Sequence, residues 1–116
     1  MESGQASDDD EYGRPVEVGG SDELAVLAAS RTVLVAFRAD WCGPCQLQDP
    51  VLETVAADTD AAVARIDVDA NPSVADAYDV RGVPTLVLLV DGERVDRLVG
   101  LRHGAELRDL LARYVG

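Results

Sequence analysis

The segment from Thr32 to Phe37 constrains the fold more than any other, because it is almost wholly apolar and rich in β-branched residues. A run of this kind is typical of a central β-strand that is buried on both faces. Such a strand needs helices packed on both sides of its sheet. The 116 residues are enough for one domain of this kind and too few for two.

The remaining hydrophobic pattern predicts the element order β-α-β-α-β-α-β-β-α. Strands are expected at residues 16–18, 32–37, 62–68, 85–90 and 94–99. Helices are expected after Ser21 as N-cap, near Cys42, after Asn71-Pro72, and along an apolar stripe from Leu107 to Val115. Asp91-Gly92 is a strong hairpin signal. Crossover units followed by a hairpin indicate the α/β class, with a central mixed sheet flanked by helices on both faces.

Residues 1–13 are polar and acidic and show no hydrophobic pattern, so we expect a disordered tail followed by a domain at 14–116. No apolar run approaches the roughly 20 residues that span a bilayer. The start of the chain also lacks the basic and then apolar pattern of a secretory signal. These observations predict a cytoplasmic protein with no membrane contact.

The net charge of −12 argues against nucleic-acid binding, which requires basic side chains against phosphates. All ten basic residues are Arg, and Lys is absent. Abundant acid without Lys resembles proteins of salt-loving archaea, where salt screens the repulsion between surface charges. A GC-rich genome would also favour Arg, but codon bias alone does not explain so acidic a balance. We therefore expect a halophilic source.

The two cysteines, Cys42 and Cys45, follow the central strand at the predicted start of a helix. Thiol–disulfide exchange needs one thiolate that attacks and a second thiol that resolves the mixed disulfide. At the positive end of a helix, Cys42 is favoured as an exposed nucleophile, and Cys45, one turn on, as the resolving thiol. The alternatives are half of a zinc site or two inert core cysteines. Structural zinc needs four ligands, and only His103 remains besides carboxylates.

The segment Trp41-Cys42-Gly43-Pro44-Cys45 resembles the active-site motif of the thioredoxin family. Arg81-Gly82-Val83-Pro84-Thr85 resembles the family's cis-proline segment. Further matches are Pro50, Asp69 to Pro72, Asp91-Gly92 and Val99-Gly100. The resemblance covers residues 15–116 and implies a thioredoxin fold.

The resemblance also implies roles that spacing alone does not. Pro84 would follow a cis peptide bond, whereas sequence alone predicts an ordinary trans turn. Val83 would offer its backbone to the substrate, and Gly43 and Pro44 would form the turn between the cysteines. The residues of the implied shallow apolar groove around Cys42 are Trp41, Gly82, Val83, Pro84, Val99, Gly100 and Leu101.

The sequence departs from the family pattern behind the second cysteine. Thioredoxins carry a buried Asp in the central strand, and the matching residue here is Ala36. Another acceptor for the Cys45 proton is then needed, and Asp67, Asp69 or water are candidates. Arg38 replaces a Trp. It would either favour the thiolate or form a surface ion pair with Asp40 or Asp69.

These observations predict a monomeric protein-disulfide reductase that works through a reversible Cys42–Cys45 disulfide. Its partners would be disulfide-containing proteins and a thioredoxin reductase. No cofactor or metal is expected, and no Gly-x-Gly-x-x-Gly fingerprint for a dinucleotide is present. One rival is a dedicated oxidant or isomerase, against which Gly43-Pro44 argues, since such proteins usually have His in that dipeptide. The other is a non-enzymatic binding module, against which the two cysteines, Trp41 and Pro84 argue.

Overall fold

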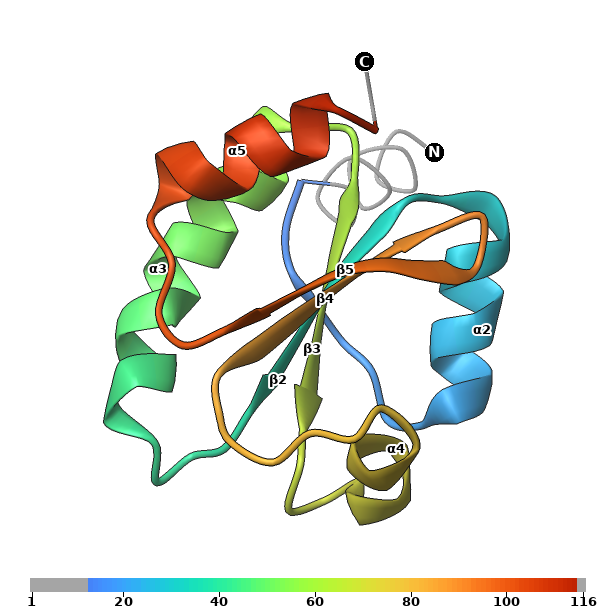
Figure 1. Ribbon diagram of the computed structural model, residues 1–116, viewed down its shortest axis with the longest axis vertical. Helices are drawn as coiled ribbons and strands as arrows, with labels where there is room; N and C mark the ends of the chain where they lie inside the picture. The colour runs from blue at the N-terminus through green and yellow to red at the C-terminus, as the bar shows by residue number, and fades with distance from the viewer. Residues whose placement is uncertain (1–12, 115–116) are drawn as a thin grey trace, which may run out of the picture.

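The computed structural model describes residues 13–114, so the expected tail up to Tyr12 and the end of the predicted helix at Val115 lie outside the described part. The elements follow the predicted order (Figure 1). The strands are β1 (Val16–Glu17), β2 (Val33–Arg38), β3 (Ala62–Asp67), β4 (Thr85–Val90) and β5 (Glu93–Val99). The helices are α2 (Ser21–Ser30), α3 (Gly43–Asp58), α4 (Pro72–Ala77) and α5 (Gly104–Ala112).

The five strands form one mixed sheet in the order β1-β3-β2-β4-β5. β1, β3 and β2 run parallel, whereas β4 is antiparallel to both β2 and β5. Alternate side chains of β2 enter two separate cores, as expected for a strand buried on both faces. Figure 1 shows α3 and α5 on one side of the sheet and α2 and α4 on the other. The predicted α/β architecture with helices on both faces is therefore confirmed.

The strand directions bring four loops to one end of the sheet. β2 and β3 both finish there, at Arg38 and Asp67, because they are parallel. β4 begins there, since Thr85 pairs with Phe37, and β5 finishes there, since Thr85 also pairs with Val99. The segments that follow β2, β3 and β5 and the one that precedes β4 therefore meet in space.

Two local details differ from the prediction. Gly20, not Ser21, is the N-cap of α2, and Ser21 is the first helical residue. β5 carries a register shift opposite Leu88 and Leu89, which places one extra residue, Val95, in that strand. This bulge explains the untidy alternation of β5 in the sequence. The hairpin at Asp91-Gly92 has positive φ at both residues, as a type I′ turn requires.

Candidate active site

Cys42 and Cys45 form a disulfide at the start of α3, with their Cα atoms 5.2 Å apart. Cys42 is the N-cap, and its sulfur accepts a hydrogen bond from the backbone N–H of Cys45 at 3.1 Å. This N–H and the positive end of the helix dipole would stabilise a thiolate at Cys42 once the bond is reduced. Cys42 is only 4% exposed and Cys45 only 1%, so the exposure predicted for Cys42 is much larger than that observed.

The loop before β4 faces the first cysteine. The peptide bond between Val83 and Pro84 is cis, which is the isomer that the resemblance implies. The carbonyl oxygen of Val83 lies 3.5 Å from the Cys42 sulfur. The Thr85 hydroxyl donates to the Gly82 carbonyl at 2.6 Å and fixes the turn from within. A hollow of 120 Å³ lies beside this loop. It is lined by Trp41, Val68, Val80, Arg81, Gly82 and Val83.

The segment after β5 joins this loop through one backbone hydrogen bond. Gly100 donates its N–H to the carbonyl of Pro84 at 2.8 Å. Gly100 has a φ angle of +96°, a backbone conformation that residues with a Cβ atom rarely adopt. The flanking Val99 and Leu101 side chains are 59% and 44% exposed, and Trp41 is 71% exposed. Large apolar side chains thus remain in water around a buried disulfide, which is typical of a surface that receives another molecule.

The acids after β3 are held by local bonds. Asp69 accepts a hydrogen bond from the Trp41 indole Nε1 at 2.8 Å, so the predicted alternative of an Arg38–Asp69 ion pair is wrong. Asp67 accepts from the backbone N–H groups of Asp69 and Ala70 at 2.8 and 3.3 Å, in an Asx-type turn. The Asp67 carboxylate therefore shapes the turn, and the Asp69 carboxylate orients Trp41.

Arg38 lies at the end of β2, on the sheet face that α3 covers. Its guanidinium donates to Asp40 at 3.1 Å and to Asp49 of α3 at 3.2 Å. Asp40 is a predicted partner, whereas Asp49 is not. Arg65 of β3 lies 3.6 Å from the other oxygen of Asp49 and also pairs with Glu17. These contacts make a chain of alternating charges across three strands and a helix.

The surroundings of Arg38 keep it charged. Burial by itself would lower the pKa of this guanidinium, but the hydrogen bond to Asp40 and the charge of Asp49 outweigh burial and raise the pKa. Its Nε is the buried side-chain nitrogen that lacks a hydrogen-bond partner within residues 13–114. Arg38 therefore carries its positive charge at every pH at which a cysteine thiol titrates.

The profile of the thioredoxin family matches residues 21–113. The chain belongs to the thioredoxin family. Thioredoxin of Mycobacterium tuberculosis is 48% identical over 84 residues, which cover 71% of this chain and 72% of that protein. Thioredoxin of Chlamydia muridarum is 40% identical over 100 residues, which cover 85% of this chain and 98% of that protein. A solved structure of a mutant thioredoxin from Halobacterium salinarum has a TM-score of 0.89 at 51% identity. It covers 91% of this chain and 95% of that one.

The family and the cysteine pair together establish the activity. This thioredoxin-family protein is a dithiol–disulfide oxidoreductase that reduces protein disulfides. None of the helices within residues 13–114 is long and apolar enough to cross a membrane. In the same part of the chain, no cluster of three or more His, Cys, Asp or Glu side chains is arranged to hold a metal ion.

Ala36 is 2% exposed and packs in the apolar core between the sheet and α3. Its neighbours in that core include Leu52 and Val55 of the helix. The position at which the family pattern has a buried acid is thus filled by a methyl group among hydrocarbon side chains. The charged groups of this region are Arg38, at the end of β2, and its partner Asp49 on α3.

Sequence reasoning missed Asp49 and Gln48, although the periodicity of α3 contained a signal for one of them. The buried residues of α3 are Cys45, Gln48, Leu52, Val55 and Ala56. Gln48 therefore lies on the buried stripe of an amphipathic helix, where a polar residue is unusual. Asp49 has no comparable signal, because its partners come from distant strands.

His103 is the N-cap residue of α5, but its side chain makes no capping hydrogen bond. Asn71 likewise is the N-cap of α4 with Pro72 at the first helical position, and its side chain donates to the Asp67 carbonyl instead. Both residues are structural.

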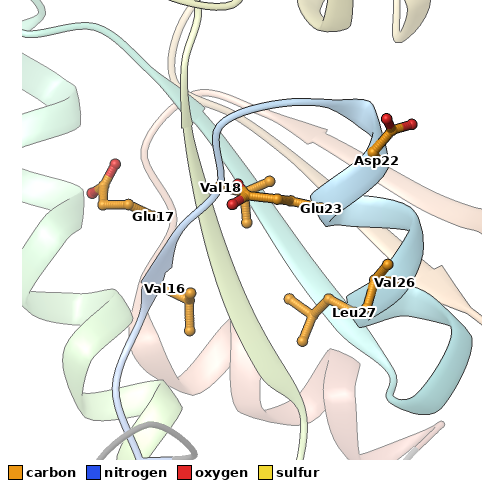
Figure 2. A pocket seen from close by; sticks show the side chains of 7 residues that line it. All are labelled: Val16, Glu17, Val18, Asp22, Glu23, Val26 and Leu27. Carbon is orange, nitrogen blue, oxygen red and sulfur yellow. The ribbon is translucent and has the colours of Figure 1, made fainter.

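A second hollow, of 410 Å³, lies between β1 and α2 and shares no lining residue with the hollow beside Trp41 (Figure 2). Val16 and Leu27 point into it, whereas Glu17 lies on the opposite side of the β1 ribbon. Val26, at its rim, is 74% exposed. No residue of the disulfide region lines this hollow, so it belongs to a different part of the surface.

Proposed function

We propose that Cys42 is the nucleophile and Cys45 the resolving thiol of a cytoplasmic, monomeric thioredoxin. The Cys42 thiolate attacks one sulfur of a substrate disulfide, which forms a mixed disulfide and releases one substrate thiolate. Cys45, deprotonated, then attacks the Cys42 sulfur. This step forms the observed disulfide and releases the second substrate thiolate, so two electrons pass to the substrate. A thioredoxin reductase returns two electrons and two protons.

The observation that carries this assignment is the hydrogen bond from the Cys45 N–H to the Cys42 sulfur, at a helix N-terminus that faces the Val83 carbonyl. The bond favours Cys42 as the sulfur that bears negative charge. Trp41, Gly82, Val83, Pro84, Val99, Gly100 and Leu101 form the proposed substrate groove. An extended substrate segment would place its disulfide against Cys42 and its backbone along Val83.

The test is reduction of insulin disulfides in concentrated salt, with dithiothreitol or a reductase as electron source. The unmodified protein is expected to accelerate reduction, and Cys42→Ser to abolish the acceleration. Activity that survives Cys42→Ser would overturn the assignment. A strongly oxidising potential of the Cys42–Cys45 pair would instead favour a dedicated oxidant.

We propose further that Arg38 helps to favour the cysteine thiolate in this protein, where the buried acid of the family pattern is replaced by Ala36. Its guanidinium pairs with Asp40, two residues before Cys42, and with Asp49 of α3, and from this place its charge would favour a cysteine thiolate. The Cys45 proton would then leave to water. Asp49 lies four residues after Cys45, on the same helix face, and holds Arg38 in place. Asp67 and Asp69, considered as acceptors from the sequence, have their carboxylates engaged elsewhere.

A halophilic archaeal source is proposed from the −12 charge, the absence of Lys and the likeness to the Halobacterium salinarum structure. Repulsion among surface carboxylates weakens as salt shortens the screening length. The free energy of unfolding, measured by denaturant titration, is expected to rise as KCl increases from about 0.1 M to about 1 M, because the screening length falls from about 10 Å to about 3 Å. Unchanged stability across that range would contradict a salt-adapted surface.

A further inference from the structure

Gln48 is the largest buried polar side chain of the core, at 1% exposure. It lies on α3 one turn after Cys45, in the stripe that also contains Leu52. Burying a primary amide without hydrogen bonds costs free energy, and here both ends of the amide are bonded. A leucine would fill such a position without needing hydrogen-bond partners. The partners of the Gln48 amide therefore indicate the role of this side chain.

Both partners of Gln48 are backbone groups of a single residue, Arg102, which lies 54 residues away in the sequence. The amide Nε2 donates to the Arg102 carbonyl at 2.9 Å, and the amide oxygen accepts from the Arg102 N–H at 2.8 Å. Residues 101–103 lie between β5 and α5 and belong to no strand or helix. Gln48 thus gives this connection the paired bonds that a neighbouring strand would otherwise supply.

Three more contacts hold the same connection. Gly100 donates to Pro84 at 2.8 Å, and the Arg102 guanidinium donates to the Val99 carbonyl and to Glu106, each at 2.9 Å. The guanidinium contacts are local, whereas Gln48 and Gly100 tie the connection to the cysteine helix and to the cis-proline loop. Val99 is held by its pairing with Thr85 in the sheet, so it is the position of the neighbouring exposed Leu101 side chain that depends on Gln48.

We propose that Gln48 is a positioning residue that fixes Leu101 and Arg102 against the cysteine helix and so sets the affinity for protein substrates. The inference rests on the proposed groove. Gln48 acts on binding and not on the sulfur chemistry, because its bonds go to the backbone of Arg102 and leave Cys42 and Cys45 untouched. A small aromatic disulfide, which reacts at Cys42 without covering Val99 or Leu101, would not require it.

The experiment compares Gln48→Leu with the unmodified protein on two substrates, insulin and 5,5′-dithiobis(2-nitrobenzoate). We expect the KM for insulin to rise about fivefold, the equivalent of one net hydrogen bond, while kcat changes little. The rate with the small disulfide and the redox potential are expected to stay unchanged. Hydrogen exchange of the Arg102 amide, followed by NMR, is expected to become faster.

The matched control is Thr54→Val, which removes an exposed side-chain bond of the same helix, from Thr54 to the Pro50 carbonyl. It is expected to change neither substrate's kinetics nor the Arg102 exchange rate. If Gln48→Leu does not fold, Gln48→Met supplies the same test, because Met is unbranched and adaptable in packing.

An equal loss toward both substrates would overturn the proposal, and so would an unchanged KM for insulin despite faster Arg102 exchange. Failure of the unmodified protein to reduce insulin would instead contradict the proposed function, so the two failures are distinguishable.

Discussion

The two sides of the disulfide are built from different kinds of groups. On the side of Cys42, the contacts come from the backbone: the Cys45 N–H, the Val83 carbonyl and the bond between Gly100 and Pro84. On the side of Cys45, side chains define the surroundings: Ala39, Val68 and Val83 pack with the cysteines. Farther along, Ala36 of β2 lies in an apolar core and Arg38 pairs with Asp49 of α3. The attacking side matches the family pattern, whereas the resolving side departs from it.

This difference shows which part of such a site can vary. Backbone groups are supplied by any sequence that keeps the turn, the helix start and the cis bond. Side-chain groups change with each substitution, and a buried carboxylate is costly unless it is paired. In this protein the charged groups on the resolving side form a partly exposed network of ion pairs, and the core around Ala36 contains hydrocarbon side chains. The following variants test the two sides separately.

The largest effect is expected from exchanging the cysteines singly. Cys42→Ser should lower the rate of insulin reduction about a thousandfold or more, because the attacking sulfur is lost. Cys45→Ser should still attack and should accumulate a mixed disulfide, which mass spectrometry detects. If Cys42→Ser instead accumulated the mixed disulfide, Cys45 would be the nucleophile and Cys42 the resolving thiol.

Ala36→Asp should restore an acid on the resolving side at the expense of stability. A carboxyl group at this site would enter the apolar core between the sheet and α3, so we expect a loss of about 2–4 kcal/mol in the free energy of unfolding. Turnover near neutral pH should become faster, since the acid would accept the Cys45 proton. Denaturant titration and stopped-flow reduction give the two values. An unchanged rate would show that proton removal from Cys45 does not limit turnover.

Arg38→Met should slow attack at neutral pH by about threefold, because a nearby positive charge no longer favours the thiolate. The thiolate fraction can be followed by its ultraviolet absorbance across a pH titration. Arg108→Met, on α5, is the control, since it removes the same charge from a residue paired with Asp58. Equal effects of the two variants would indicate that net charge, and not the position of Arg38, is responsible.

The smallest effects should separate the two partners of Arg38. Asp49 is 22% exposed and also contacts Arg65, whereas Asp40 is 87% exposed. Asp49→Asn is therefore expected to lower the free energy of unfolding by about 1 kcal/mol, and Asp40→Asn by a few tenths at most. Thermal or denaturant unfolding measures both. A larger loss of stability for Asp40→Asn than for Asp49→Asn would show that Asp40, and not Asp49, is the main partner of Arg38.

The sequence predicts the fold well where the signal is local. The apolar segment of β2, the Asp91-Gly92 turn and the helix that starts after Cys42 are all found within a residue of their expected positions. The order of elements then leaves few ways to arrange them. The start of α2 is also found within a residue, but its N-cap is Gly20 and not the expected Ser21.

The site could be predicted only as far as motifs reach. Cys42, Cys45 and Pro84 stand in segments that resemble a known family. Asp49 and the amide of Gln48 act through partners on other elements, and no local pattern specifies those partners. Arg38 illustrates the limit: its charge was evident from the sequence, but its pairing with α3 in place of Asp69 depends on how the helix crosses the sheet.

The exposed side chains of Trp41, Val99 and Leu101 make the entrance to the disulfide apolar in a chain of net charge −12. In molar salt, charges act over only about 3 Å, so the acidic surface no longer selects which molecules approach. Recognition then depends on contact alone. If these residues form the proposed groove, a partner with a flexible, uncharged strand around its disulfide would be favoured, and the folding state of the partner would influence whether its disulfide is reduced.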